Sequence, residues 1–267
     1  MSTLSFIHWN ISPEIFSIGP VHIRWYGLLF ALAFILGYQI LFYIFKIENK
    51  SQKQLDSLTI YMVIGTIFGA RLGHCLFYEP NIYLANPIEI LYVWHGGLAS
   101  HGAAIGILLS LWLYLRKNRE FNFLWMVDRL VIVVALAAFF VRLGNFFNSE
   151  ILGLPSTVPW AVVFERIDKF PRHPAQLYEG ITYLLLFIVL LSIYIKNKVN
   201  LRLGLTTGIF LTSMFTMRFL IEYVKEYQAE FESTLPLDMG QFLSIPFIIL
   251  GIIFLFVSLK RNKKIET

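Results

Sequence analysis

The chain has 267 residues, of which 57% are hydrophobic, 15% are charged and 25 are phenylalanine. Its mean hydropathy of +0.65 excludes an ordinary soluble domain and places most of the chain in lipid. The net charge of +5 does not indicate a nucleic-acid partner, because the basic residues flank apolar runs, as in proteins whose membrane orientation they fix.

A membrane-spanning helix needs roughly 20 predominantly apolar residues, and seven such runs follow one another. The sequence therefore predicts an all-α, polytopic membrane helix bundle of about seven transmembrane helices in one domain, residues 1–267, with an outer loop at 148–174. The first 20 residues lack a basic start, an apolar run and a small-residue cleavage site, so no signal peptide is expected. The predicted spans lie near residues 22–45, 57–79, 97–115, 125–147, 175–195, 203–224 and 240–259.

Basic residues are distributed unevenly between the two sets of span ends. One set carries thirteen of them and the other carries five. The positive-inside rule then predicts an external N-terminus and a cytoplasmic C-terminus. The thirteen residues are Lys46, Lys50, Lys53, Arg116, Lys117, Arg119, Lys196, Lys198, Arg202, Lys260, Arg261, Lys263 and Lys264.

Polar side chains within the predicted spans are the first indication of chemistry. A charge at the centre of a span costs roughly 2.5–3.5 kcal/mol, so such residues are expected to face a polar interior. Asp128 and Arg129 lie near an inner span end, where an interfacial anchor is expected. The alternating direction of the spans places the others in the outer half of the bilayer: Tyr26, Arg71, His74, His101, Arg142, Asn145, Asn148, Gln176, Glu179, Arg218, Glu222 and Gln241.

These residue types predict a water-accessible pocket that binds an anion. Guanidinium groups suit phosphate, and an imidazole offers a base near neutral pH. Spacings of three and four align Arg218, Glu222 and Lys225 on one helix face. Structural alternatives stay open, since Arg218 with Glu222 could simply join helices, and Arg71 could pair with Glu79.

One run, Arg142-Leu-Gly-Asn-Phe-Phe-Asn-Ser-Glu-Ile-Leu-Gly153, carries a recognisable pattern. Here the sequence resembles the prolipoprotein diacylglyceryl transferases, whose signature has Arg, Gly, Asn, Phe, Asn, Glu and Gly at this spacing. Lys225 stands where that family usually has arginine, and Leu154 where a basic residue is common. Other landmarks occur in the family's order: Ile23–Gly27, Gly69–Gly73, Gly96-Gly97 with His101-Gly102, His173–Glu179 and Met239–Pro246.

The resemblance implies an enzyme that transfers the diacylglyceryl group of phosphatidylglycerol to the lipobox cysteine thiol of prolipoprotein signal peptides. A thioether forms and glycerol 1-phosphate leaves, which is the first step of bacterial lipoprotein maturation. The implied location is the bacterial cytoplasmic (inner) membrane, with the active site toward the outer leaflet. The thiol, with an ordinary pKa near ~8.5, must lose its proton, and charge on the departing phosphate must be neutralised. No metal, cofactor or nucleic acid is implied.

Residue roles follow from the same resemblance, position by position. His101 would be the general base or its closest assistant, Arg142 and Arg218 the phosphate clamps, and Glu222 the residue that orients Arg218. Glycines around His101 would let backbone approach lipid or a neighbouring helix. The implied substrate-binding residues are Tyr26, Arg71, Gly97, Asn145, Asn148, Glu150, Gly153, Gln176 and Tyr178.

Two other classes of protein also carry buried charge. A seven-helix transporter or receptor for an anionic ligand is one, but the last predicted span holds no lysine for a retinal linkage and the two halves show no repeat. A helix-bundle assembly factor is the other, and it would not need its charges gathered at one depth.

Overall fold

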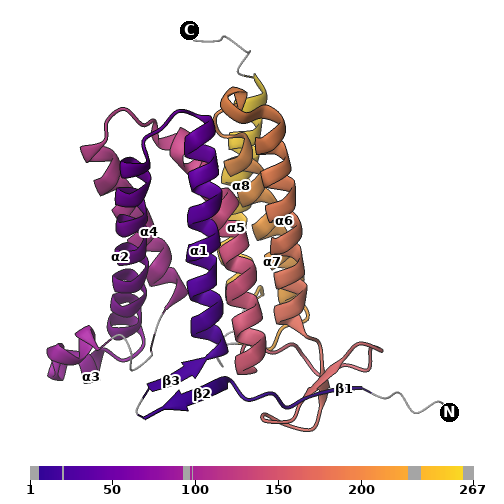
Figure 1. The fold of residues 1–267 in the computed structure, drawn as a ribbon. Helices are drawn as coiled ribbons and strands as arrows, with labels where there is room; N and C mark the ends of the chain where they lie inside the picture. The colour runs from indigo at the N-terminus through magenta and orange to yellow at the C-terminus, as the bar shows by residue number, and fades with distance from the viewer. Residues whose placement is uncertain (1–5, 20, 93–96, 98, 228–235, 261–267) are drawn as a thin grey trace. The chain divides into compact units, whose positions relative to one another are not determined.

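The computed structural model describes residues 6–19, 21–92, 97, 99–227 and 236–260, and 71% of the protein is helical. Residues 1–41 with 127–267 form one compact unit, and residues 42–126 form a second. Seven helices of 18 or more residues lie within the described ranges (Figure 1): α1 (Trp25–Ile47), α2 (Gln52–Phe77), α4 (Ser100–Lys117), α5 (Phe123–Asn148), α6 (Ala175–Asn197), α7 (Leu205–Glu222) and α8 (Met239–Lys260).

These helices coincide with the seven predicted spans to within a few residues. Five of them, α1, α2, α5, α6 and α8, are long and apolar enough to cross a membrane. This supports a polytopic membrane protein. Helices α4 and α7 have 18 residues each, and serine, threonine and charged side chains interrupt their apolar runs. A membrane crossing by these two helices therefore stays a prediction.

Five short strands make the all-α prediction incomplete. Strands β1 (Ile7–Trp9), β4 (Val162–Phe164) and β5 (Pro171–Arg172) form one sheet in the order β1-β4-β5, with β1 parallel and β5 antiparallel to β4. Strands β2 (Glu14–Ile18) and β3 (Val21–Arg24) form an antiparallel hairpin. Runs this short give no readable alternation of apolar residues. They form because backbone outside the helices still needs hydrogen-bond partners.

Two apolar clusters among the described residues contribute to the packing of the larger unit. Leu29 and Ala33 of α1 pack against Leu136 and Phe140 of α5. Beyond the helix ends, Phe164 of β4 joins a second buried cluster that includes the end of α5. Within a bilayer such helix contacts are stabilised by close van der Waals packing rather than by exclusion of water. The end of α5 and the small sheet are thereby held in one place.

Asp128 caps the start of α7 from a neighbouring helix. Its carboxylate accepts hydrogen bonds from the backbone N–H groups of Gly204 (2.6 Å) and Thr207 (2.9 Å), and from the hydroxyl of Thr206 (3.0 Å). Asp128 is fully buried, so the predicted interfacial anchor is wrong. The N-terminus of α7 needs an acceptor for its free N–H groups, and Gly204 has no side chain to supply one.

In the smaller unit, α2 and α4 pack through glycines at four-residue intervals. Gly65, Gly69 and Gly73 of α2 face Gly102 and Gly106 of α4, and a Cβ at any of them would overlap the facing backbone. Stripes of small residues at this spacing let two membrane helices approach closely. Gly102 therefore admits a neighbouring helix, which is one of the two roles expected for it.

Candidate active site

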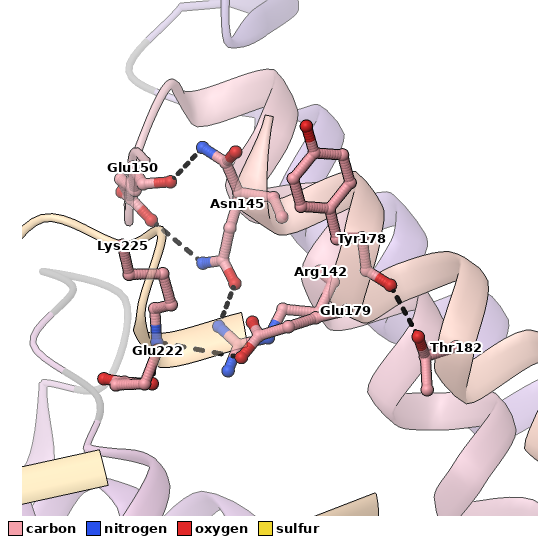
Figure 2. Close-up of polar contacts among 9 residues, drawn as sticks. Arg142, Asn145, Glu150, Tyr178, Glu179, Thr182, Glu222 and Lys225 are labelled. Carbon is pink, nitrogen blue, oxygen red and sulfur yellow. Dashed lines mark hydrogen bonds and ion pairs between the residues drawn. The ribbon is translucent and has the colours of Figure 1, made fainter. Parts of the chain in front are cut away.

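A buried network of four charged side chains lies in the larger unit, where α5 ends, α6 begins and α7 ends (Figure 2). Nε of Arg142 lies 2.5 Å from Oε2 of Glu179. Nζ of Lys225 lies 3.7 Å from Oε1 of Glu179 and 2.9 Å from Oε2 of Glu222. The Glu179 side chain is fully buried, and the other three expose 12% or less of their surface. Two cations and two carboxylates therefore neutralise one another in a site of low polarity.

The pairing differs from the one expected on α7. Glu222 binds Lys225, and within the described ranges no ion pair joins Glu222 to Arg218. Lys225 follows the end of the helix, where its ammonium group can lie between two carboxylates. Arg218 is half-buried, and no hydrogen bond or ion pair reaches it from the part of the chain that the structure describes. Arg218 therefore has capacity left for an anionic ligand.

The signature residues form one continuous chain of hydrogen bonds (Figure 2). Arg142 donates to Oδ1 of Asn145 (3.2 Å), and Nδ2 of Asn145 donates to Oε2 of Glu150 (3.1 Å). Asn148 donates to the second oxygen of the same carboxylate at 3.0 Å, and Gln176 of α6 donates to the Glu150 backbone carbonyl. The spacing of the signature is therefore the spacing at which these side chains meet around the C-terminus of α5.

The loop after α5 holds two residues in an uncommon backbone conformation. Ser149 and Ile151 have φ values of 57° and 55°, a left-handed region that a β-branched residue such as isoleucine rarely adopts. The loop is held by its ends, since the Gly153 N–H donates to the His173 carbonyl at 3.1 Å. A Cβ at Gly153 would overlap that carbonyl, which explains why the signature ends in glycine.

Two predicted binding tyrosines lie in the same unit. The Tyr26 ring packs on Gly144 of the signature, where an added Cβ would lie 2.7 Å from the ring. The Tyr178 hydroxyl accepts a hydrogen bond from Nε1 of Trp160 at 2.7 Å and lies 3.0 Å from Nδ1 of His173. Contact of these tyrosines with substrate stays a prediction.

A second polar cluster lies in the smaller unit and contains His101. Nε2 of His101, the second residue of α4, lies 2.9 Å from the hydroxyl of Tyr78, which directly follows α2. The Tyr78 ring stacks on His74, and Nε2 of His74 lies 3.4 Å from Oε2 of Glu79. His101 and Tyr78 are both exposed, as a group that exchanges protons with a substrate must be.

Arg71 and Gly97 support this second cluster. Arg71 is 2% exposed and donates to the backbone carbonyls of Glu89 (2.6 Å) and Ile90 (3.1 Å). Gly97 has a φ of +67°, and a Cβ there would overlap the His74 ring. These contacts of Arg71 are with backbone carbonyls, whereas Glu79, its expected partner, lies against His74. Substrate binding by Arg71 and Gly97 stays a prediction. Gly96 lies outside the described residues.

Comparison with known proteins decides the family. The family model described as prolipoprotein diacylglyceryl transferase matches residues 13–257. The chain belongs to the prolipoprotein diacylglyceryl transferase family.

Full-length relatives of this transferase family member agree with the match. It is 49% identical to the phosphatidylglycerol–prolipoprotein diacylglyceryl transferase of Chloroherpeton thalassium, over 100% of both chains. The proteins of the same name from Tolumonas auensis and Bacteroides fragilis are 48% and 43% identical. The former comparison covers 97% of this chain and 100% of the relative, and the latter covers 96% of each.

Sequence reasoning did not assign site roles to two buried residues that contact the signature of this transferase family member, Glu179 and Arg172. Glu179 joins Arg142 to Lys225, and its position three residues after Gln176 on one helix face was the available signal. Arg172 is one of the five basic residues on the other set of span ends, and the sequence suggested no further role for it. It is 7% exposed and donates to the Gly153 carbonyl at 3.2 Å, so it holds the end of the signature loop.

The ion pair of Arg172 with Asp168 predicts how this loop responds to acid. Hydrogen bonds from Arg172 hold the pKa of Asp168 below its ordinary value. Because the folded-state pKa is lowered, the stabilisation is fully present above the ordinary carboxyl pKa and is lost as pH falls through the lowered value. We expect amide hydrogen exchange in residues 148–174, corrected for intrinsic rates, to speed up between pH 6 and about pH 3.

The control for this experiment is Asp168→Asn. This variant should exchange faster than the unmodified protein at pH 6 and should show little further change on acidification. Equal pH dependence in both proteins would assign the acid response to another group.

Proposed function

We propose that this protein transfers the diacylglyceryl group of phosphatidylglycerol to the lipobox cysteine of prolipoproteins and releases glycerol 1-phosphate. Membership of the family and the names of its full-length relatives support this activity. The observation that carries the proposal is the unbroken chain of hydrogen bonds from Arg142 through Asn145 to Glu150. Family membership does not favour a transporter or receptor for an anionic ligand.

The reaction is a displacement at carbon. The thiol sulfur attacks the glyceryl carbon that carries the phosphate, an S–C bond forms, and the C–O bond breaks with its electron pair on the phosphate oxygen. The thiol proton passes to a ring nitrogen of His101. The single cysteine of this chain, Cys75, is fully buried, so the attacking thiol comes from the second substrate. The reaction as written needs no metal or redox cofactor.

Arg218 and Arg142 take different parts in binding the phosphate. Arg218 has free hydrogen-bonding capacity, so it would bind the phosphate directly and neutralise the charge that develops on it. Arg142 is already paired with Glu179 at 2.5 Å. It would present its remaining donors in an orientation that Glu179 and Asn145 fix. Four residues of the signature would line the lipid-binding surface: Asn145, Asn148, Glu150 and Gly153. Outside the signature, the same surface would include Tyr26, Gln176 and Tyr178.

The activity is tested directly with two defined substrates. Purified protein is mixed with phosphatidylglycerol and a lipobox peptide, and release of glycerol phosphate is measured together with the mass of the peptide. We expect both glycerol phosphate and a peptide heavier by one diacylglyceryl group. A peptide with serine in place of cysteine serves as the control. Failure to release glycerol phosphate from the cysteine peptide would overturn the proposal.

The substitution Arg218→Lys is expected to lower turnover at least tenfold, equivalent to about 1.4 kcal/mol of transition-state stabilisation. Lysine keeps the charge but loses the planar pair of donors that matches a phosphate. Arg142→Lys should have a comparable effect, because one lysine ammonium cannot bond Glu179 and Asn145 in the same geometry. Arg166→Lys, in an exposed loop, is the control and should be unchanged. Near-normal rates in both variants would make these arginines structural.

We also propose seven spans, an external N-terminus and a cytoplasmic C-terminus. This orientation would put the signature residues, 142–153, at the outer leaflet of the bacterial cytoplasmic membrane. The excess of basic residues on one set of helix ends supports this orientation. Reporter fusions after residues 50, 118, 198 and 264 should all report a cytoplasmic location. An external signal from two of them would overturn the orientation.

A further inference from the structure

The close approach of α2 and α4 brings a tyrosine against His101. Gly73 and Gly102 face each other with so little room that a Cβ on Gly73 would lie 2.7 Å from the Cα of Gly102. His101 directly precedes Gly102, and Tyr78 lies just beyond the end of α2 at Phe77. This packing places the Tyr78 hydroxyl 2.9 Å from Nε2 of His101.

The Tyr78 ring lies between two imidazoles. It stacks on His74 with the ring centres 5.7 Å apart and an interplanar angle of 15°, and on His101 at 6.0 Å and 27°. The Tyr78 backbone N–H donates to the His74 carbonyl at 2.9 Å, so backbone and ring are both held. Three other ionisable groups lie around this stack: Glu79, which pairs with His74, Tyr83, whose ring meets His74 edge-on at 6.0 Å, and Arg71, which binds backbone carbonyls.

The hydrogen bond decides which nitrogen of His101 can accept a proton. If the phenol donated to Nε2, the neutral imidazole would carry its proton on Nδ1 and would have no free lone pair. If Nε2–H donates to the phenol oxygen, the lone pair on Nδ1 is free. No hydrogen bond to Nδ1 occurs within the described ranges of the chain. Only the second arrangement is compatible with His101 as a base.

We propose that Tyr78 is a positioning residue for His101. Its oxygen accepts the Nε2–H hydrogen bond and so makes Nδ1 the nitrogen that receives the thiol proton. The same bond persists when His101 becomes an imidazolium, because Nε2 keeps its hydrogen. This inference rests on the proposed function, in which His101 is the general base. Tyr78 itself touches neither the thiol nor the phosphate in this scheme.

Tyr78→Phe tests the proposal, because it keeps the stacked ring and removes only the hydroxyl. We expect kcat to fall roughly tenfold, the effect of one lost hydrogen bond on the reacting group, with KM unchanged for phosphatidylglycerol and lipobox peptide. Tyr61→Phe removes a hydroxyl from α2, the helix that precedes Tyr78, away from this cluster, and is the matched control. It should retain the normal kcat.

A double-mutant cycle separates positioning from a general structural role. Tyr78→Phe is combined with His101→Gln, and the four rates are measured with radiolabelled phosphatidylglycerol over long incubations. If Tyr78 acts through His101, its replacement should have little effect once His101 is gone. An equal tenfold loss in both backgrounds would show that Tyr78 acts independently and would overturn the proposal.

The remaining outcomes distinguish this proposal from the proposed function. A fully active Tyr78→Phe protein beside an inactive His101→Gln protein would remove the role of Tyr78 and leave the base intact. A higher KM with normal kcat would make Tyr78 a binding residue and would also overturn the proposal. A fully active His101→Gln protein would remove the base, and the role of Tyr78 with it, while the transfer activity itself would still stand.

Discussion

His101→Gln is expected to lower turnover at least a hundredfold at neutral pH, the usual contribution of a general base. The variant should fold normally, because His101 is exposed at the start of α4 and its described hydrogen bond is the one to Tyr78. The loss should shrink as pH rises. A thiol with an ordinary pKa near ~8.5 begins to ionise without help above neutrality.

The measurement is glycerol phosphate release between pH 7 and pH 9.5, with thermal unfolding in detergent as the check on folding. A stable variant that is inactive at pH 7 and partly active at pH 9 supports the base. Full activity at pH 7 would make His101 a packing residue. Inactivity at every pH together with lost lipid binding would move His101 from proton transfer to headgroup binding.

Glu179→Leu is expected to destabilise the protein by roughly 3–5 kcal/mol, the cost of removing one partner from a buried ion pair. Arg142 would lose its counter-ion at 2.5 Å, and Lys225 would lose one of its two. Leucine offers no acceptor in exchange. Unfolding midpoints in detergent measure the effect, and Glu165→Gln, whose exposed carboxylate pairs with His8, should change stability by less than about 0.5 kcal/mol.

A double variant shows whether the loss of stability in Glu179→Leu comes from the unpaired charge of Arg142. Adding Arg142→Met to Glu179→Leu removes both members of the closest pair, and Lys225 keeps Glu222 as its partner at 2.9 Å. Part of the lost stability should return, because the double variant no longer buries an unpaired guanidinium. Activity should not return with it, since Arg142 belongs to the proposed phosphate site. A single variant as stable as the control would mean that Glu179 is not needed to neutralise its neighbours.

Asp128 is an example of a residue whose contacts could not be predicted from the sequence. Its position at the end of an apolar run predicted an anchor at the membrane surface. The structure instead buries it against the start of α7, where Gly204 offers no cap of its own. The acceptor that α7 requires comes from a residue 76 positions earlier in the chain. Local spacing carries no information about a partner so distant.

The sequence by itself determined where the long helices lie and to which family the chain belongs. Both are local properties, since a run of apolar residues specifies a helix in lipid and the signature brings Arg142, Asn145 and Glu150 together around one helix end. Tertiary structure decided which charges pair. Whether Glu222 meets Arg218 or Lys225, and whether Arg142 meets Glu179, depends on how the ends of α5, α6 and α7 pack.

The contact between Tyr78 and His101 was likewise beyond the sequence. The two residues are 23 positions apart, one directly after α2 and the other at the start of α4. They meet because glycines on both helices remove the side chains that would keep the backbones apart. Helix formation follows from the nearest few residues, whereas the choice of partner for a polar side chain follows from close packing between segments distant in the chain.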